Sequence, residues 1–162
     1  MDARVAISLR SQHRQHGLML IEALVSILIL SVAILGLIGM EGAMIGLAQD
    51  AKHRADAAFL AEQIVGVMWA DKRSERSSYA HRVTGTNCTF SGAASTNNRV
   101  TNWIGNANTA GTVLGTLPRA MQQISFAGDK VTVTLCWQSQ QDRQRGKQPH
   151  KYVLVSKIEG GL

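Results

Sequence analysis

The hydrophobic positions of this chain follow three successive patterns. From Ala23 to Met40, eighteen residues follow one another without a charge, bounded by Glu22 and Glu41. Apolar and charged residues then alternate with helical spacing to about residue 72, and no proline occurs before Pro118. The remainder is rich in Asn, Thr, Ser, Gln and Gly. These patterns predict one long helix over residues 18–72, followed by a polar head over residues 73–162.

The uncharged run has the length of a membrane span. On a helix that rises ~1.5 Å per residue, Glu22 and Glu41 would stand roughly 28 Å apart, close to the ~30 Å thickness of the hydrocarbon layer. The alternative is a buried core helix, but the run is longer than most core helices, and no second element this apolar could enclose it. We therefore expect a transmembrane segment at about residues 18–42.

The charge distribution predicts the orientation of this span. Lys and Arg exceed Asp and Glu by 17 to 11, a formal net charge of +6. Arg4, Arg10 and Arg14 precede the span with only Asp2 to oppose them, and short basic flanks stay in the cytoplasm. We expect a single-pass membrane protein with a cytoplasmic N-terminus and an exported head. At 162 residues the chain is large enough for one small domain, which argues against a multidomain enzyme.

The head has strand signals only near its C-terminal end. Residues 123–126 and 131–137 flank a predicted hairpin turn at residues 127–130, and residues 151–158 form a third candidate strand. We expect an irregular loop over residues 73–121 and an antiparallel sheet over residues 122–160. The fold class is then α+β, a long N-terminal helix packed on a small antiparallel sheet. Four alternating side chains of the second strand should face the helix: Val131, Val133, Leu135 and Trp137.

The soluble half of the helix carries two apolar stripes on nearly opposite sides. The first contains Leu47, Ala51, Ala55 and Ala58, and the second contains Leu60, Ile64, Val67 and Met68. We expect the first stripe to meet neighbouring subunits and the second to meet the protein's own sheet. Asp50 with Arg54, and Lys52 with Asp56, are spaced for ion pairs along the helix.

A row of glycines lies in and just after the membrane segment. Gly36, Gly39, Gly42 and Gly46 fall on one side of the helix. Small residues allow close helix packing in lipid, but membrane helices also contain more glycine in general. Both interpretations remain open.

No catalytic constellation is present in the sequence. The five histidines are scattered, and the common nucleophile, zinc-protease and nucleotide-binding motifs are absent. We therefore expect neither an enzyme nor a cofactor or metal site. One basic cluster near the C-terminus could bind DNA or an acidic surface, although such runs are often only solvated loops. It consists of Arg143, Arg145, Lys147, His150 and Lys151.

Cys88 and Cys136 are the only cysteines, and both lie in the segment expected to be exported. An even pair in an oxidising compartment favours a disulfide, the alternative being two unlinked thiols.

The junction before the apolar run is specific. A short basic leader ends in Gly17, apolar Leu18 follows, and Glu22 is the fifth residue after the glycine. An acid is otherwise avoided in such a run. This combination resembles the processing site of type IV prepilins, although Leu18 stands where that motif usually has an aromatic residue.

The resemblance implies that residues 1–17 are a leader peptide. Prepilin peptidase would cut between Gly17 and Leu18, and Leu18 would be N-methylated. The new α-amine and Glu22 would lie one helical turn apart, so Glu22 could pair within one subunit or with a neighbour and set the register of assembly. The alternative is an interfacial glutamate without a partner.

Later residues resemble the PilV-like minor pilins. The features are Trp103, Leu117-Pro118, a strand ending in Trp137, and Gln63-Ile64 with Val67-Met68 in the helix. The resemblance implies a low-abundance component of the type IV pilus that contributes to its assembly or to adhesion. Its partners would be other major and minor pilins and the inner-membrane assembly machinery. Two alternatives remain: a type II secretion pseudopilin, which shares the processing site, and a pilus-tip module that binds DNA or surfaces.

Overall fold

The computed structural model describes residues 16–158, without side-chain detail at residues 16, 17, 43 and 73. The predicted leader therefore lies almost wholly outside the described residues, as do residues 159–162 at the end of the predicted sheet region. The chain divides into two compact units, Met1–Leu47 and Ala48–Leu162.

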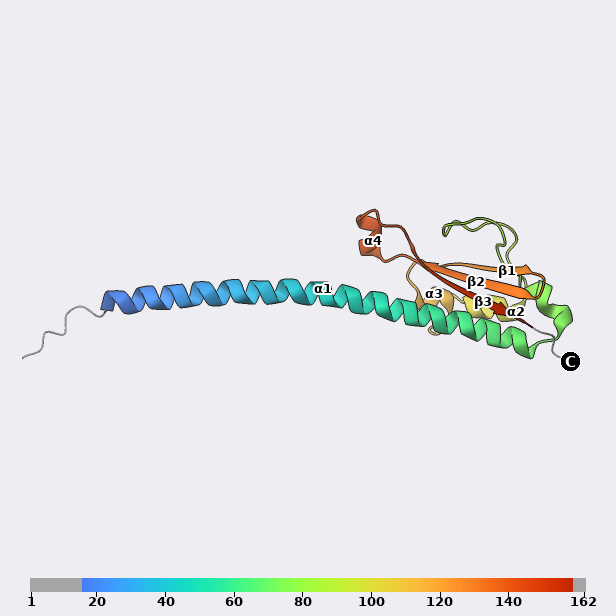
Figure 1. Ribbon diagram of the computed structural model, residues 1–162, viewed down its shortest axis with the longest axis horizontal. Helices are drawn as coiled ribbons and strands as arrows, with labels where there is room; N and C mark the ends of the chain where they lie inside the picture. Colours follow the sequence, from blue (N-terminus) through green and yellow to red (C-terminus); the bar gives the residue numbers. More distant parts are fainter. Residues whose placement is uncertain (1–15, 159–162) are drawn as a thin grey trace, which may run out of the picture. The chain divides into compact units, whose positions relative to one another are not determined.

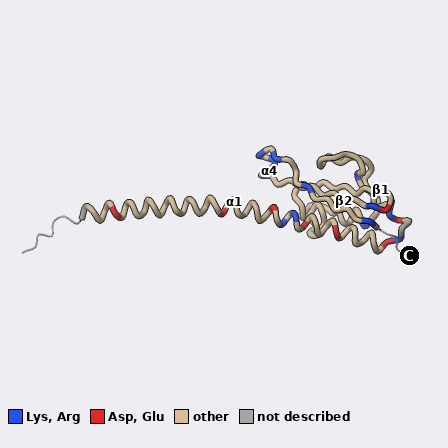
Figure 2. The backbone as a smooth tube through the Cα atoms, in the orientation of Figure 1, with Lys and Arg blue, Asp and Glu red and all other residues tan. Residues whose placement is uncertain are grey.

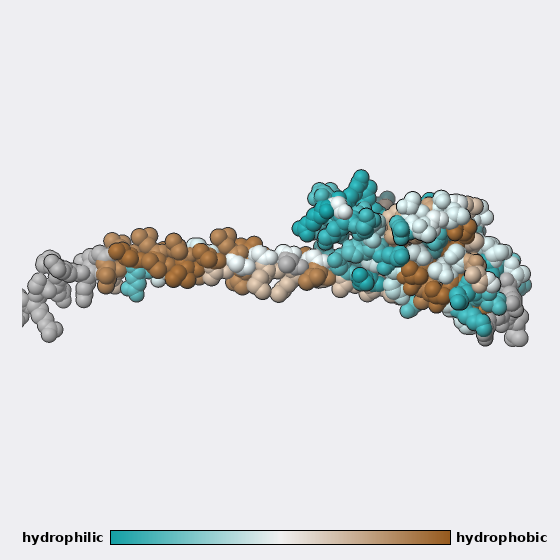
Figure 3. Space-filling view, turned by 45° about the horizontal axis from the view of Figure 1, so that its top comes forward, coloured by the Kyte–Doolittle hydropathy of each residue, from teal (hydrophilic) through white to brown (hydrophobic). Residues whose placement is uncertain are grey.

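The described part of the first unit is the first half of one helix, α1 (His16–Ala70) (Figure 1). Its large apolar side chains are exposed, and Figure 3 shows an almost continuous hydrophobic surface along it. Within residues 16–158, α1 is the one helix long and apolar enough to cross a membrane. None of the described residues covers its most apolar window, so these exposed side chains would favour an apolar environment such as a membrane.

The second unit contains a three-stranded antiparallel sheet in the order β1-β2-β3 (Figure 1). The strands are β1 (Met121–Ala127), β2 (Lys130–Trp137) and β3 (His150–Lys157). Ala127 pairs with Lys130, so Gly128 and Asp129 alone make the turn, and Gly128 takes a positive φ of 61° that favours glycine. The predicted α+β class, long N-terminal helix and three antiparallel strands are confirmed.

One core joins α1 to the inner face of the sheet. Leu60, Ile64 and Met68 of α1 are at most 1% exposed, whereas Leu47 is 71% and Phe59 is 63% exposed. The predicted assignment of the second stripe to the protein's own core is therefore confirmed, apart from Val67, which is only partly buried. The opposing side chains from the second strand are fully buried, as expected from their alternation: Val131, Val133, Leu135 and Trp137.

The connection between α1 and the sheet is more regular than the sequence predicts. It contains η1 (Arg73–Tyr79), α2 (Asn98–Ile104) and α3 (Val113–Thr116). Polar side chains cap the two α-helices, because Asn97 and Thr112 each accept a hydrogen bond from a backbone N–H of the first turn. The helix α1 itself ends at Ala70, two residues before its predicted end.

Candidate functional site

The residues of the predicted processing site lie in the first two turns of α1. Gly17 and Leu18 are helical, and the Leu18 side chain is 75% exposed. Glu22 follows one turn later on the same face and is also exposed. Among residues 16–158, Glu22 has no cation within ion-pair distance. Its carboxylate is therefore exposed and without an ionic partner in the described part of the chain.

The glycine row has no packing role within this chain. A methyl group added at Gly36, Gly39, Gly42 or Gly46 would meet no atom within 4 Å outside the adjoining helix backbone. Their small size is thus not required by the described fold. This leaves close packing against another helix, or the ordinary composition of membrane helices, as the explanation.

Cys88 and Cys136 form a disulfide in the structure, with their Cα atoms 5.8 Å apart. Cys136 lies in β2 and Cys88 in the connection before α2, and both side chains are buried. The bond attaches a segment without regular secondary structure to the central strand. The pair therefore has a structural position in the head.

The basic cluster gathers around α4 (Gln140–Gln144), a short helix inside the predicted polar loop (Figure 2). Arg143 belongs to α4, Arg145 follows it directly, and Lys151 lies on β3. All three are exposed, and none has a carboxylate within ion-pair distance in the described part of the chain. Lys147 differs, because its ammonium group lies 3.2 Å from Asp142. Figure 3 shows a hydrophilic surface over this region.

Asp142, which the sequence pattern did not single out, organises this segment. The Ser139 hydroxyl donates to Asp142 Oδ2 at 2.6 Å, and Lys147 Nζ lies 3.2 Å from Oδ1. The hydrogen bond from Ser139, together with those from Lys147 and His150, holds the pKa of Asp142 at about 2, although burial opposes the shift. The Ser-x-x-Asp spacing from Ser139 to Asp142 is a helix-capping signal that could have revealed α4.

His150 connects Asp142 to α1. Its Nε2 lies 3.3 Å from Asp142 Oδ2 and 3.8 Å from Asp50 Oδ1, and its ring stacks on Trp137 with centroids 5.6 Å apart. His150 was expected in the basic binding cluster, but its side chain is largely buried between these groups.

The ion pairs predicted along α1 are not formed. Among residues 16–158, neither Asp50 with Arg54 nor Lys52 with Asp56 is within ion-pair distance. Asp50 faces His150 instead, because contact with the head offers a partner that spacing along the helix does not reveal.

Three side chains here have the geometry of a small metal site. One ligand atom each from Asp50, Asp142 and His150 lies within 4.8 Å of the others. However, Lys147 already places a cation on Asp142, and Ser139 uses the same carboxylate. The Ser139 hydroxyl and His150 Nε2 both contact Asp142 Oδ2. The arrangement is suited to holding the His150 ring and α4 in place.

Two further side chains have perturbed pKa values inside the head. Burial and the hydrogen bond to Asp71 raise the pKa of Tyr79 to about 12. Burial, with a smaller contribution from Arg82, lowers the pKa of His81, whose Nδ1 accepts from the Ser95 backbone N–H. Both are packed against neighbouring segments, which indicates structural roles.

Comparisons with protein-family models, with curated proteins and with solved structures found no match to this chain. Any functional conclusion therefore depends on the chain's own residues and their geometry.

Proposed function

We propose that this protein is a PilV-like minor pilin of the type IV pilus. Prepilin peptidase removes residues 1–17, Leu18 becomes the methylated N-terminus, and the helix remains in the inner membrane with the head in the periplasm. The protein is then recruited by other pilins and the inner-membrane assembly machinery. It acts as a structural component without catalysis or a cofactor. The observation that carries this proposal is an exposed acid, Glu22, placed one turn after Leu18 on an otherwise apolar, uncovered helix.

Cleavage would supply the charge that Glu22 lacks. A free α-amine has a reference pKa near ~8 and is largely cationic at neutral pH. The amine at Leu18 lies within reach of Glu22 of the same chain or of a neighbour. An unpaired acid inside the bilayer costs up to about 2.5–3.5 kcal/mol at its centre and less near the interface. Pairing with a neighbour's amine therefore favours one axial register between adjacent helices.

The uncovered helix supports the same conclusion. Its apolar side chains would be buried in the lipid of the membrane first and against the helices of other subunits after assembly. The four glycines, beside which the described fold leaves open space, would allow those helices to approach closely.

The experiment compares Glu22→Ala with Glu41→Ala, the two acids that bound the apolar run. Both full-length variants are expressed in piliated bacteria that lack the parent chain. We expect Glu22→Ala to enter sheared surface fibres about tenfold less than the parent, while Glu41→Ala enters normally. Equal amounts of both variants in the membrane fraction are the control. Equal incorporation of the two variants would contradict the proposal.

The same experiment would give a different result if this chain were a type II secretion pseudopilin. The chain would then be absent from surface pili, and Glu22→Ala would reduce protein secretion without changing pilus number.

The second candidate function is the binding of DNA or an acidic surface by the exposed part of the basic cluster. It is favoured because Arg143 and Arg145 have no carboxylate within ion-pair distance among the described residues. The double variant Arg143→Glu, Arg145→Glu should weaken DNA uptake or adhesion, and weaken it most at low salt, with piliation unchanged. Loss of piliation would instead indicate that this surface contacts other subunits.

A further inference from the structure

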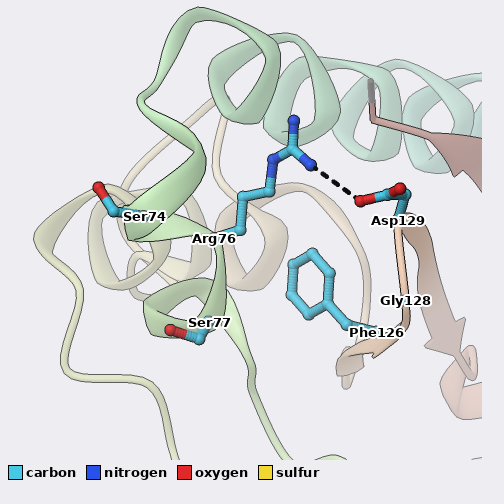
Figure 4. Close-up of a pocket in the computed structure, with 6 residues that line it drawn as sticks. All are labelled: Ser74, Arg76, Ser77, Phe126, Gly128 and Asp129. Carbon is cyan, nitrogen blue, oxygen red and sulfur yellow. Dashed lines mark ion pairs between the residues drawn. The ribbon is translucent and has the colours of Figure 1, made fainter. Parts of the chain in front are cut away.

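The pockets of the head differ in whether their basic side chain already has an anionic partner. In the pocket of Figure 4, the guanidinium group of Arg76 points toward Asp129, and its Nη1 lies 3.5 Å from Asp129 Oδ1. Another pocket, of about 460 Å³, contains Lys151, which has no carboxylate within ion-pair distance among residues 16–158. This volume falls in the range of ~300–1,000 Å³ that is usual for small-molecule sites. The residues that line this second pocket are Asn87, Cys88, Gln148, Pro149 and Lys151.

Three polar residues line the second pocket, and all three are exposed. Lys151 contributes a positive charge, and Asn87 and Gln148 contribute side-chain amides. Neither amide has a hydrogen-bond partner in the described part of the chain. Lys151 follows His150 in β3, and successive side chains of a strand point to opposite faces, so Lys151 points away from the carboxylates around His150. The charge and both amides are therefore available to a ligand from solution.

The two segments that form this pocket are held in place before any ligand binds. The disulfide joins Cys88 to Cys136, and Cys136 pairs with Lys151 in the register of β2 and β3. On the other side, the ring of Pro149 fixes its own φ and restricts the backbone of Gln148 before it. Because the lining groups are already positioned, binding loses little conformational entropy.

We propose that this pocket binds a sugar acid, such as the terminal residue of an acidic polysaccharide. A sugar acid brings one carboxylate for Lys151 and several neighbouring hydroxyl groups. Each hydroxyl donates as well as accepts, so hydroxyls satisfy both the N–H groups and the carbonyl oxygen of an amide. A DNA backbone would offer Lys151 a phosphate, but phosphate oxygens only accept and would leave the amide oxygens of Asn87 and Gln148 unpaired. The pocket therefore suits a sugar acid better than duplex DNA.

Lys151 belongs to the basic cluster, so this proposal rests on the second candidate function above and names its ligand. Binding is measured on the isolated protein. Its failure would therefore leave pilus incorporation, and the DNA uptake of the Arg143→Glu, Arg145→Glu variant, to be decided by their own experiments.

The test is an NMR titration of the ¹⁵N-labelled full chain in detergent micelles, which follows the side-chain amide signals of Asn87 and Gln148. The probes are methyl glucuronide and methyl glucoside, which differ in having a carboxylate or a hydroxymethyl group on the same ring. We expect methyl glucuronide to shift both signals saturably. Methyl glucoside should bind at least about tenfold more weakly, because it lacks the charge that contacts Lys151. Acetate, which has the carboxylate without the hydroxyls, should also bind at least about tenfold more weakly.

A matched pair of lysine variants tests the charge. Lys151→Gln should bind the two sugars with similar, weak affinity. Lys130→Gln changes another exposed lysine, which pairs with Lys157 at the opposite end of the same two strands, and should keep the preference of the parent for methyl glucuronide. Both substitutions are at exposed positions and should leave the fold intact.

Three results would overturn the proposal. One is the absence of a saturable shift with methyl glucuronide, and another is an equal response of the parent chain to both sugars. The third is a short DNA duplex that shifts the Asn87 and Gln148 signals where methyl glucuronide does not, which would assign the pocket to nucleic acid.

Discussion

Among single residues, Asp142 holds three partners in a segment for which the sequence predicts only a loop. Ser139, Lys147 and His150 all contact its carboxylate, and His150 extends the network to Asp50 of α1. The carboxylate therefore links α4 to β3 and to the helix beneath the sheet.

The acid sensitivity of the head should depend on Asp142. Its pKa is depressed from 3.8 to about 2 in the folded protein, so its contribution to stability is present above about pH 4 and is lost as the pH falls toward about 2. We expect Asp142→Asn to lower the free energy of unfolding by about 1 kcal/mol at pH 7 and by much less near pH 2. Thermal denaturation across this range measures the difference.

Glu75→Gln, at an exposed acid of η1, is the control and should change little. If Asp142→Asn matched the parent at pH 7, the network would contribute nothing to stability.

Among the elements, α1 has two faces with different environments in the head. Ile64 is 1% exposed and packs in the core, whereas Phe59 is 63% exposed. The same charged substitution should therefore change the stability of the head by very different amounts at two nearby positions of one helix.

We expect Ile64→Asp to destabilise the head by more than about 3 kcal/mol, because it removes core packing and buries a charge. Phe59→Asp should change stability by less than about 0.5 kcal/mol. Chemical denaturation followed by tryptophan fluorescence compares them, and similar losses for both variants would show that the core assignment is wrong.

The disulfide between the segment before α2 and β2 should contribute to the free energy of unfolding of the head. Cys88 and Cys136 are 48 residues apart, and the chain-entropy model gives about 4 kcal/mol for closing such a loop. The double variant Cys88→Ser, Cys136→Ser should lose a large part of this stability, while the parent under reducing conditions should behave like the variant. A variant as stable as the oxidised parent would contradict the prediction.

These elements also show which features can be predicted from the sequence alone. The long helix and the strands are local patterns, so the uncharged run and the alternation of Val131 to Trp137 predict them correctly. The short helices in residues 73–121 and α4 depend on single capping residues such as Asn97 and Ser139, which form a weak signal in a polar segment. The contacts of Asp50 with His150 and of Arg76 with Asp129 join residues far apart in the chain, and no spacing rule predicts them.

For the whole molecule, the proposed function depends on one covalent event, the proposed cleavage at the start of α1. A long, apolar and exposed helix is compatible with many membrane proteins. The proposed cleavage after Gly17 would distinguish a pilin from an ordinary membrane-anchored domain, because it would create an amine with which Glu22 could pair.

The most direct measurement is the intact mass and N-terminal sequence of the protein isolated from surface fibres. We expect the chain to begin at Leu18 with a methylated amine. The Gly17→Val variant should keep residues 1–17 and remain in the membrane fraction. Fibres that contain the chain with Met1 still attached would contradict the proposed cleavage.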